Sequence, residues 1–351
     1  MKYGYLILQD GTTFKGTLYG YKKETSGEIV FNTCMTGYTN SMTDPSYYGQ
    51  ILVFTYPLIG NWGVLKNMEF ESEKIQVKGI VVSEISKFYS HFNSVSSLHE
   101  WCFKNKIPIL SGIDTRYLTQ ILRKFGTMLG GIFFKKKDNL KFDDINKINL
   151  VKFVSNNKIQ IIAKPNFKYT VVLYDLGVKK SIITSLLKRK IRIIKVPWNF
   201  NIDKLKVKFS GVVISNGPGD PKNVKHTIKE VQKIIRKDIP ILGICLGNQI
   251  IALALGADTY KLKFGHRSLN QPVLNEKTKK AFITSQNHGY AVDIKSLPKN
   301  LKVWFKNLND GTCEGLYHTK KRIISTQFHP EAKPGPKDTE WIFNEFLEMI
   351  K

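Results

Sequence analysis

The sequence predicts an α/β protein with a β-rich α+β domain at the N-terminus and a doubly wound, mostly parallel sheet at the C-terminus. The chain has 351 residues, a length typical of two domains, and its 42% hydrophobic content is enough for two cores. Up to about Phe134, short alternating runs are separated by turn signals, without regular βα order. From Tyr169 onward, strand and helix patterns alternate, which is typical of a parallel sheet.

The N-terminal part contains the signals of several short strands and two helices. Residues 6–8 lead into Asp10-Gly11 and form the arm of a predicted hairpin. Further strands are expected at 28–31, 50–55 and 77–82, and helices at 98–105 and 115–124. The Lys/Asn/Asp-rich stretch 135–168 is interpreted as the connection, with a short helix near 143–153. We therefore assign residues 1–150 to the first domain, 151–168 to a linker and 169–351 to the second domain.

The C-terminal part has the rhythm of a doubly wound sheet. Strands are expected at 171–175, 191–196, 212–215, 239–244 and 322–328, and helices at 179–190, 224–237 and 246–255. Ligands of such sheets bind at the carboxyl ends of the strands. Residues that directly follow these strands are therefore the candidates for a functional site.

Cys245 is the first of these candidates. It follows a short apolar run within Gly243-Ile244-Cys245-Leu246-Gly247, and a helix-forming run comes next. This is the pattern of a nucleophile elbow, in which flanking glycines avoid a clash in a crowded turn. A thiol at a helix N-terminus favours the nucleophilic thiolate. A lone cysteine in an apolar run is more often a buried hydrophobic side chain, so the motif needs partners elsewhere in the chain.

His329 and Glu331 are the expected partners. They follow the predicted strand 322–328, and Pro330 between them ends the strand ladder. Residues two apart in an extended chain share a face, so the carboxylate can orient the imidazole and stabilise its cation. Such a pair alone is more often found at the surface. With the elbow cysteine it predicts a Cys-His-Glu arrangement.

Composition limits the cellular locations and the binding partners that we expect for this protein. The four cysteines have neither paired nor metal-ligand spacing, and the N-terminus has no signal-peptide pattern, so we expect a cytoplasmic protein without a metal site. The apolar stretch 239–257 contains Asn248, Gln249 and several glycines, which argues against a membrane span. The formal net charge is +26, but the lysines are dispersed, so we predict no specific nucleic-acid binding. Attraction to an acidic partner remains open.

The motifs resemble a known family. GICLGNQ, SNGPGDP and FHPEA resemble the triad-type (class I) glutamine amidotransferase domain. DGTTFKG, GEIVFNTCMTGYTNSMTDPSYYGQI, TYPLIGNWG and SGIDTRYLTQILRKFG resemble the small subunit of carbamoyl-phosphate synthetase. The resemblance extends from about Leu6 to Phe346.

The resemblance implies an activity and a partner. The family hydrolyses the side-chain amide of L-glutamine and passes ammonia to a large synthetase subunit, which makes carbamoyl phosphate from bicarbonate and ATP for arginine and pyrimidine synthesis. No cofactor is expected in this chain, which lacks a Gly-rich phosphate loop followed by Lys-Ser/Thr, and Mg-ATP is expected in the large subunit. The assembly is expected to be a heterodimer, and a higher oligomer of heterodimers stays open.

The resemblance also implies roles for individual residues. Cys245 is the implied nucleophile, His329 the base and Glu331 its orienting carboxylate. The oxyanion hole would use the Leu246 N–H and a glycine N–H of the Gly217-Pro218-Gly219 loop, since proline has none. The implied glutamine-binding residues share exposed backbone or polar side chains, and they are Ser46, Gly217, Gly219, Leu246, Gln249, Asn287, Gly289 and Tyr290. Ser46 would bring the N-terminal domain into the active site.

The sequence departs from the family pattern at three places. Asn248 stands where the family usually has His, and Tyr290 where it usually has Phe. Arg267-Ser268-Leu269 replaces a stretch that is commonly rich in glycine. Because Ser and Leu disfavour positive φ, this change puts the local loop conformation in question, and with it coupling or glutamine affinity.

Two alternatives remain at the level of the sequence. One is an amidotransferase that serves guanylate, cytidylate or anthranilate synthesis, against which the segments 35–38 and 112–116 argue. The other is a decayed regulatory or scaffolding subunit, which the Ser268-Leu269 change favours and the intact Cys245, His329 and Glu331 oppose.

Overall fold

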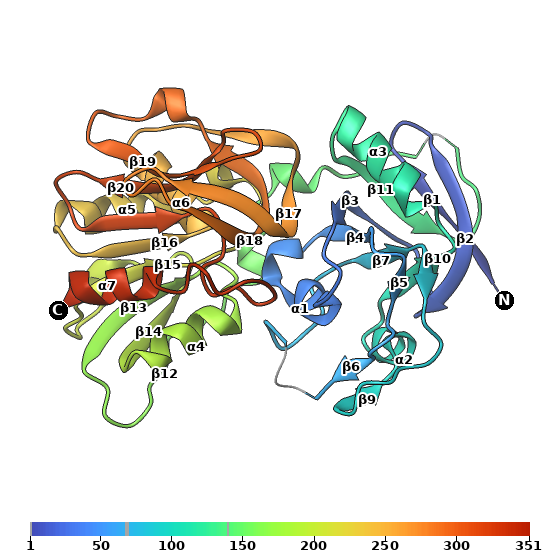
Figure 1. Ribbon diagram of the computed structural model, residues 1–351, viewed down its shortest axis with the longest axis horizontal. Coiled ribbons are helices and arrows are strands. Elements are labelled where there is room, and N and C mark those ends of the chain that lie inside the picture. Colours follow the sequence, from blue (N-terminus) through green and yellow to red (C-terminus); the bar gives the residue numbers. More distant parts are fainter. Residues whose placement is uncertain (1, 67–69, 139) are drawn as a thin grey trace. The chain divides into compact units, whose positions relative to one another are not determined.

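The computed structural model describes residues 2–66, 70–138 and 140–351 (Figure 1). Within them the chain forms two compact units, Met1–Asn146 and Lys147–Lys351. Each unit has its own core and is described by itself.

The N-terminal unit is built on a closed barrel with the strand order β1-β11-β3-β4-β7-β10-β2. The predicted hairpin is present as β1 and β2, which pair antiparallel, whereas β3, β4 and β7 run parallel. Two small two-stranded sheets, β5-β8 and β6-β9, complete the unit. Its elements are β1 Tyr3–Leu8, β2 Thr13–Gly20, β3 Thr25–Asn32, α1 Tyr38–Thr43, β4 Gln50–Phe54, β5 Leu58–Ile59, β6 Val64–Leu65, β7 Gly79–Val82, β8 Glu84–Ile85, β9 Ser94–Ser96, α2 Leu98–Lys104, β10 Pro108–Ser111, α3 Thr115–Phe125 and β11 Met128–Phe133.

The C-terminal unit contains a ten-stranded sheet with the order β12-β14-β13-β15-β16-β21-β20-β19-β17-β18. Strands β14, β13, β15, β16 and β21 are parallel, as the alternation of strands and helices predicts. Its elements are β12 Gln160–Ile162, β13 Tyr169–Asp175, α4 Lys180–Lys188, β14 Ile191–Pro197, β15 Gly211–Ile214, α5 Lys225–Arg236, β16 Ile241–Ile244, α6 Leu246–Ala254, β17 Thr259–Asn275, β18 Ala281–Val292, β19 Leu301–Asn307, β20 Cys313–His318, β21 Ile323–Thr326 and α7 Ile342–Ile350.

Helices cover both faces of the parallel strands (Figure 1). On one face, Val171 and Leu173 of β13 pack in a core with residues of α4 and α7. On the other face, Val172 and Tyr174 pack in a core with residues of α5 and α6. Successive residues of a strand point to opposite faces, so a continuous apolar run is what a strand buried on both sides requires. This is the doubly wound architecture expected from the sequence.

The predicted linker and the predicted helix at 143–153 are wrong. Residues 151–168 belong to the second unit: Val151 is fully buried in its core, and β12 pairs with β14 at the sheet edge. Residues 143–153 form two 3-10 turns, Ile145–Lys147 and Val151–Phe153. The side chains of Asp144 and Asn149 accept hydrogen bonds from nearby backbone N–H groups, which competes with an α-helix.

The region between α6 and β21 carries structure that the sequence patterns do not predict. Strands β17, β18, β19 and β20 extend the parallel sheet by antiparallel pairing. Strand β17 is interrupted by two irregularities in its pairing with β18, which blur the alternation of apolar and polar residues. The C-terminal domain is therefore parallel at its centre and antiparallel beyond β21.

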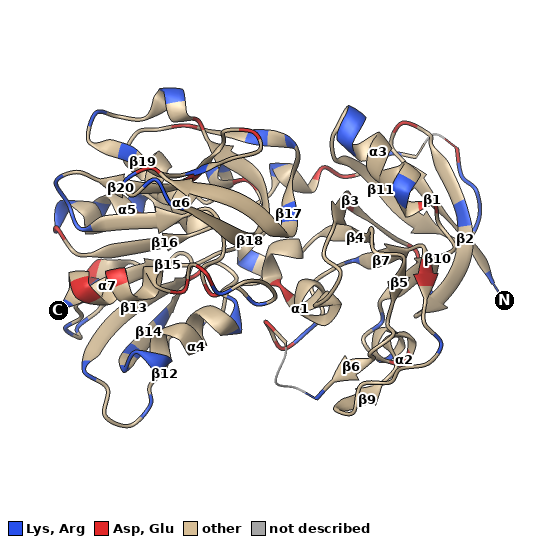
Figure 2. Ribbon diagram, viewed as in Figure 1, with Lys and Arg blue, Asp and Glu red and all other residues tan. Residues whose placement is uncertain are grey.

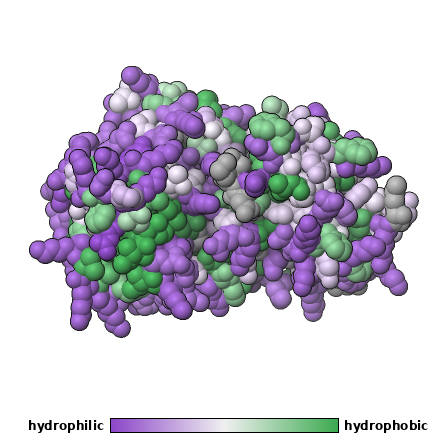
Figure 3. Space-filling view, turned by 90° about the horizontal axis from the view of Figure 1, so that it is seen from below, coloured by the Kyte–Doolittle hydropathy of each residue, from purple (hydrophilic) through white to green (hydrophobic). Residues whose placement is uncertain are grey.

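Charged and apolar side chains are distributed over both units. Figure 2 shows Lys and Arg scattered along the ribbon rather than gathered on one element. Figure 3 shows a largely hydrophilic face whose most extensive apolar area lies on the side of the C-terminal unit, with smaller apolar areas elsewhere. Within the described residues, every helix is too short or too polar to span a membrane.

Leu242→Ala should destabilise the C-terminal unit. Leu242 is fully buried on β16, and its truncation removes apolar contacts and leaves a cavity, which should lower the free energy of unfolding by about 2–5 kcal/mol. Urea unfolding followed by circular dichroism measures the loss. Leu308→Ala is the control, because Leu308 is 53% exposed and should change stability by less than about 0.5 kcal/mol. Equal midpoints for the two variants would contradict the packing described here.

Candidate active site

Cys245 lies alone between a strand and a helix. Strand β16 ends at Ile244 and α6 begins at Leu246, and Cys245 takes φ 55° and ψ −103°. A non-glycine residue with positive φ is strained and persists only where its surroundings enforce it. A Cβ on Gly247 would lie 2.1 Å from the carbonyl oxygen of Ile214 on the neighbouring strand. The glycine is therefore required by the close approach of the two backbones, as the elbow motif predicts.

The thiol of Cys245 is held by two polar neighbours. Its Sγ lies 3.6 Å from the carbonyl oxygen of Asn287, and the side-chain amide of Gln327 lies 3.7 Å from the same sulfur. Gln327 also accepts hydrogen bonds from the side chains of Asn248 and Gln249. Asn248 in turn accepts one from Ser325. These hydrogen bonds link the polar residues beneath the turn into one network. Asn248, which stands where the family usually has His, both donates and accepts within it.

His329 and Glu331 point toward each other just after β21. The Nδ1 of His329 lies 2.7 Å from Oε1 of Glu331, and both residues are buried. The backbone N–H of His329 donates to the carbonyl of Ser285 on β18, which fixes the chain after the strand ends. Within the described part of the chain, Nε2 of His329 makes no hydrogen bond. This nitrogen is therefore available to a group at the thiol.

Lys179 completes this buried group of charges, and the sequence motifs did not point to it. Its Nζ lies 3.0 Å from Oε1 of Glu331, and both side chains are almost fully buried. Lys179 directly precedes α4, a few residues after β13, so its position at the carboxyl end of a parallel strand was the signal that could have found it. Its backbone N–H donates to the side chain of Asn216 in the loop after β15.

The charges shift the pKa values of the pair. Burial alone would raise the pKa of Glu331, but Lys179 and His329 outweigh it and hold this pKa at about 2. Burial alone would lower the pKa of His329, but the Glu331 carboxylate outweighs it and raises this pKa well above its ordinary value, while Lys179 opposes the rise. Cys245 is close enough to raise the pKa of His329 further. At neutral pH the group therefore favours a carboxylate and an imidazolium.

The loop after β15 and the start of α6 offer backbone N–H groups. A Cβ on Gly217 would lie 2.2 Å from the carbonyl oxygen of Leu176, and Gly219 has φ +89°, so both positions favour glycine. Leu246 is the first residue of α6, where backbone N–H groups have no partner within the helix. These are the donors that an oxyanion would need.

The other predicted binding residues divide between the two units. Gln249 donates from its side chain to the carbonyl of Tyr290 on β18, 2.8 Å away, and Asn287 and Gly289 precede Tyr290 on the same strand. Contacts through Asn287 and Gln327 thus link these residues to Cys245 within the C-terminal unit, and their role in binding glutamine remains a prediction. Ser46 lies in the N-terminal unit, in a 3-10 turn where its N–H donates to Asp44, and its role remains a prediction.

The concern about Arg267-Ser268-Leu269 does not apply to the backbone. These residues lie within β17 and have negative φ, whereas the positive φ in this region belongs to Gly265, at +70°. Arg267 and Ser268 pair in register with Asn287 and Gln286. The residues that replace glycine are therefore extended, and no left-handed conformation is required of them.

One group of described residues has the composition of a metal site. His266, His288 and Glu314 are buried, and one ligand atom from each lies within 4.8 Å of the others. Burial alone would lower the pKa of His266, but Asp310 and Glu314 outweigh it and raise it to about 9. Burial lowers the pKa of His288. The sequence did not indicate this group, because its members are far apart in the chain and are brought together only by the antiparallel strands.

Comparison with known proteins gives matches along the whole chain. The model of the family "Glutamine amidotransferase class-I" matches residues 172–349, and that of "Carbamoyl-phosphate synthase small chain, CPSase domain" matches residues 6–132. The carbamoyl phosphate synthase arginine-specific small chain of Neurospora crassa is 47% identical over 98% of this chain and 79% of its own length. The carbamoyl phosphate synthase small chain of Pyrococcus furiosus is 42% identical over 100% of this chain and 98% of its own.

A third relative is much longer than this chain. The multifunctional protein CAD of Squalus acanthias is 46% identical over 99% of this chain, which corresponds to 16% of that protein. Each of these relatives matches both units, and the elbow turn and the His329–Glu331 pair lie within the region of the amidotransferase model. The chain belongs to the family of carbamoyl-phosphate synthase small chains.

Proposed function

We propose that this chain is the glutamine-hydrolysing subunit of a carbamoyl-phosphate synthetase. Cys245 at the strained turn and the buried His329–Glu331 pair near it carry the proposal. The match of both units to small chains supports the choice of this synthetase over other amidotransferase pathways. The ammonia would pass to a large subunit that makes carbamoyl phosphate.

The proposed chemistry needs one nucleophile and one base. The thiolate of Cys245 attacks the amide carbon of glutamine, and a C–S bond forms as the carbonyl oxygen becomes an oxyanion. The Leu246 N–H and a glycine N–H of the loop 217–219 stabilise that charge. His329, having taken the thiol proton, gives it to the departing nitrogen, so the C–N bond breaks and ammonia leaves.

The second half of the cycle removes the glutamyl group. Water, deprotonated by His329, attacks the thioester carbon, the C–S bond breaks, and glutamate leaves with the thiolate restored. Glu331 keeps the imidazole oriented and stabilises its positive form in both halves. Asn287 contacts the nucleophile through its carbonyl, and Gln249 donates to the carbonyl of Tyr290. Together with Gly289, these residues would bind the substrate with hydrogen bonds from backbone and side chain.

Lys179 would tune this machinery without touching the substrate. Because it keeps Glu331 ionised and opposes the rise in the pKa of His329, it keeps the imidazolium from holding its proton too tightly. A base whose pKa lies far above the working pH does not readily donate its proton to the leaving group. Lys179 is therefore a positioning residue of the proposed site.

The remaining parts of the reaction belong to the proposed partner. The large subunit would bind Mg-ATP and bicarbonate, and the product would serve arginine and pyrimidine synthesis in the cytoplasm. We propose a heterodimer as the working unit. The excess of dispersed Lys and Arg in Figure 2 would favour an acidic surface on that partner.

Cys245→Ser should separate the two activities of the complex. We expect glutamine-dependent synthesis to fall below detection, because the alcohol is a far weaker nucleophile, while ammonia-dependent synthesis stays within about twofold of wild type. Carbamoyl phosphate formation from each nitrogen source, with the purified large subunit present, measures both. Equal loss of the two activities would sink the proposed division of labour, whereas retained glutaminase activity would exclude Cys245 as the nucleophile.

Cys245 should react with iodoacetamide at least about tenfold faster than Cys102 or Cys313 at pH 8. Burial raises the pKa of Cys313 to about 12 and raises that of Cys102 well above its ordinary value, so neither forms thiolate readily. Cys245 differs in its surroundings, because it lies at the N-terminus of α6 with His329 close by as a base for the reacting thiol. Mass spectrometry of timed digests gives the three rates in one sample. Comparable rates would argue against an activated thiol at position 245.

Lys179→Met should shift the acid limb of kcat/KM for glutamine hydrolysis to higher pH, by about one unit. Glu331 has a folded-state pKa below its ordinary value, so the stabilisation it provides is present above about pH 4.5 and is lost as the pH falls toward 2. Without Lys179 the carboxylate is protonated at higher pH and releases His329. The variant should also be less stable, because the buried Glu331 carboxylate loses one of its two cationic partners.

The neighbouring Lys180 provides the matched control, since its side chain is exposed at the start of α4. Lys180→Met should leave both the pH profile and the stability unchanged. If Lys179→Met lowers activity equally at every pH, Lys179 acts only in packing and the proposed electrostatic role is wrong.

A further inference from the structure

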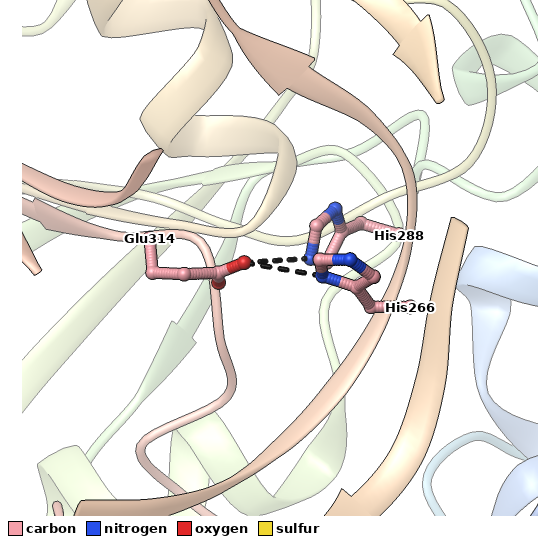
Figure 4. Close-up of side chains that lie close together, drawn as sticks. All are labelled: His266, His288 and Glu314. Atoms are coloured by element: carbon pink, nitrogen blue, oxygen red, sulfur yellow. Dashed lines mark hydrogen bonds and ion pairs between the residues drawn. The ribbon is translucent and has the colours of Figure 1, made fainter. Parts of the chain in front are cut away.

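The buried group His266, His288 and Glu314 contains none of the residues of the proposed reaction, and its side chains point toward one another (Figure 4). Oε1 of Glu314 lies 3.2 Å from Nδ1 of His266 and 3.6 Å from Nε2 of His288. The side-chain oxygen of Gln286 lies 2.9 Å and 3.2 Å from the same two nitrogens. Two nitrogens and two oxygens therefore face one another across a short distance, from strands β17, β18 and β20.

The outward nitrogens of both rings are committed to acceptors. Nε2 of His266 lies 2.9 Å from a carboxylate oxygen of Asp310, and Nδ1 of His288 lies 2.9 Å from the carbonyl oxygen of Tyr290. A carboxylate and a carbonyl accept hydrogen bonds only, so these nitrogens carry the ring protons. In metal sites, histidine ligands almost always donate their second N–H to a carboxylate or a backbone carbonyl in this way.

With one proton on each ring, the inward nitrogens are lone pairs that face oxygen lone pairs. Gln286 cannot turn its amide around at no cost, because its NH₂ donates to Thr284, whose hydroxyl donates to the carbonyl of Gln271. Thr312 donates to Glu314 Oε1 over 3.3 Å, and Asn307 reaches His266 Nδ1 and the same oxygen only at 3.4 and 3.5 Å. The second oxygen of Glu314 is buried without a hydrogen bond within the described residues. The arrangement calls for a positive charge at its centre.

Protons alone satisfy this arrangement poorly. One proton on His266 leaves Nε2 of His288 facing two acceptors. A second proton would create two buried imidazolium ions with ring centroids 4.8 Å apart, and like charges so close repel strongly away from water. A dication, in contrast, would balance the carboxylates of Glu314 and Asp310 and use both lone pairs.

We propose that His266, His288 and Glu314 bind a divalent transition-metal ion of the Zn²⁺ type, with the Gln286 side-chain oxygen as a fourth ligand. Zn²⁺ binds imidazole nitrogen and carboxylate oxygen at about 2.0–2.2 Å, so its tetrahedral ligands lie roughly 3.3 Å from one another. The four nitrogen–oxygen distances of 2.9, 3.2, 3.2 and 3.6 Å are close to that value, whereas the ligand atoms of His266, His288 and Glu314 spread over 4.8 Å, so the two nitrogens would move toward each other on binding. Mg²⁺ and Ca²⁺ prefer sites made of oxygen alone and fit less well.

The ion would have a structural role. It would tie β17, β18 and β20 together at His288, whose neighbours Asn287 and Gly289 belong to the proposed glutamine site. Water can reach the outer edge through Asp310, whose side chain is 41% exposed beside His266. Metal binding itself does not depend on the proposed function, so a failure of one would not be a failure of the other.

The test uses the full chain with Cys245→Ala, so that no thiolate at the active site competes for the metal. The chelator-treated protein is titrated with Zn²⁺ alone by calorimetry and with Co²⁺ alone by visible absorption. We expect one ion per chain and the intense d–d bands of a four-coordinate Co²⁺ site without a sulfur charge-transfer band. Wild type should give the same tight equivalent.

Variants assign the ion to these residues. Glu314→Gln keeps the shape but removes the charged ligand, and should weaken Zn²⁺ binding at least tenfold. Asp310→Asn leaves the ligands in place at a part-exposed position, and should weaken binding about 10–100-fold through His266. His226→Ala, which removes an exposed histidine on α5, is the control and should change nothing.

Two results would overturn the proposal. The first is the absence of a stoichiometric Zn²⁺ or Co²⁺ site in both wild type and the Cys245→Ala chain. The second is equal affinity in Asp310→Asn and the control, with circular dichroism showing both folded, because the outer partner of His266 would then have no bearing on the ion. Should Glu314→Gln fail to fold, Asp310→Asn still decides.

Discussion

The close approach of β15, β16 and α6 at Gly247 is the constraint on which the rest of the site depends. A single Cβ there would meet the backbone of Ile214, so the chain must turn without one, and the strain falls on Cys245. That turn fixes where the thiol points. Because β16 also pairs with β21, the residues that follow Thr326 emerge beside the thiol, and His329 is among them. The geometry of the site is thus inherited from strand pairing in the core, where it is protected from local changes.

Charge balance is the second constraint, and it makes the site cooperative. Lys179, Glu331 and His329 are all buried, and each would be costly to bury alone. Together, Glu331 lies between two cationic partners, 3.0 Å from one and 2.7 Å from the other. Removal of Glu331 would leave two buried cations without a partner, whereas removal of Lys179 or His329 would leave the carboxylate with one partner instead of two. A buried group of charges is costly to desolvate and would bring no benefit to a subunit without catalytic activity. Its presence therefore favours hydrolysis over a scaffolding role.

The sequence predicts those parts of the molecule whose signals are local. The elbow at Cys245, the parallel strands and their helices follow from runs of five to ten residues, and so does the hairpin of β1 and β2. Lys179 and the His266 group cannot be identified from local patterns, because their partners lie far away in the chain and are brought together only by the sheet topology. The antiparallel extension cannot be identified from them either, since the irregular pairing of β17 breaks the alternation that marks a strand. The wrong helix at 143–153 shows the opposite failure, in which side chains of Asp144 and Asn149 take the hydrogen bonds that a helix would need.

Strand β18 joins the proposed active site to the histidine group, and its pleat explains how one strand serves both. Gln286 and His288 are two residues apart and reach the same group, while Asn287 between them contacts the thiol through its carbonyl. A change on one face of this strand therefore moves the backbone that the other face uses. If the histidine group holds an ion, the backbone of β18 is anchored from behind, and the carbonyl of Asn287 keeps its distance from Cys245 without any ligand at the front. A backbone that is already anchored loses little conformational entropy when the substrate binds. This is the advantage of building a site on strands rather than on loops.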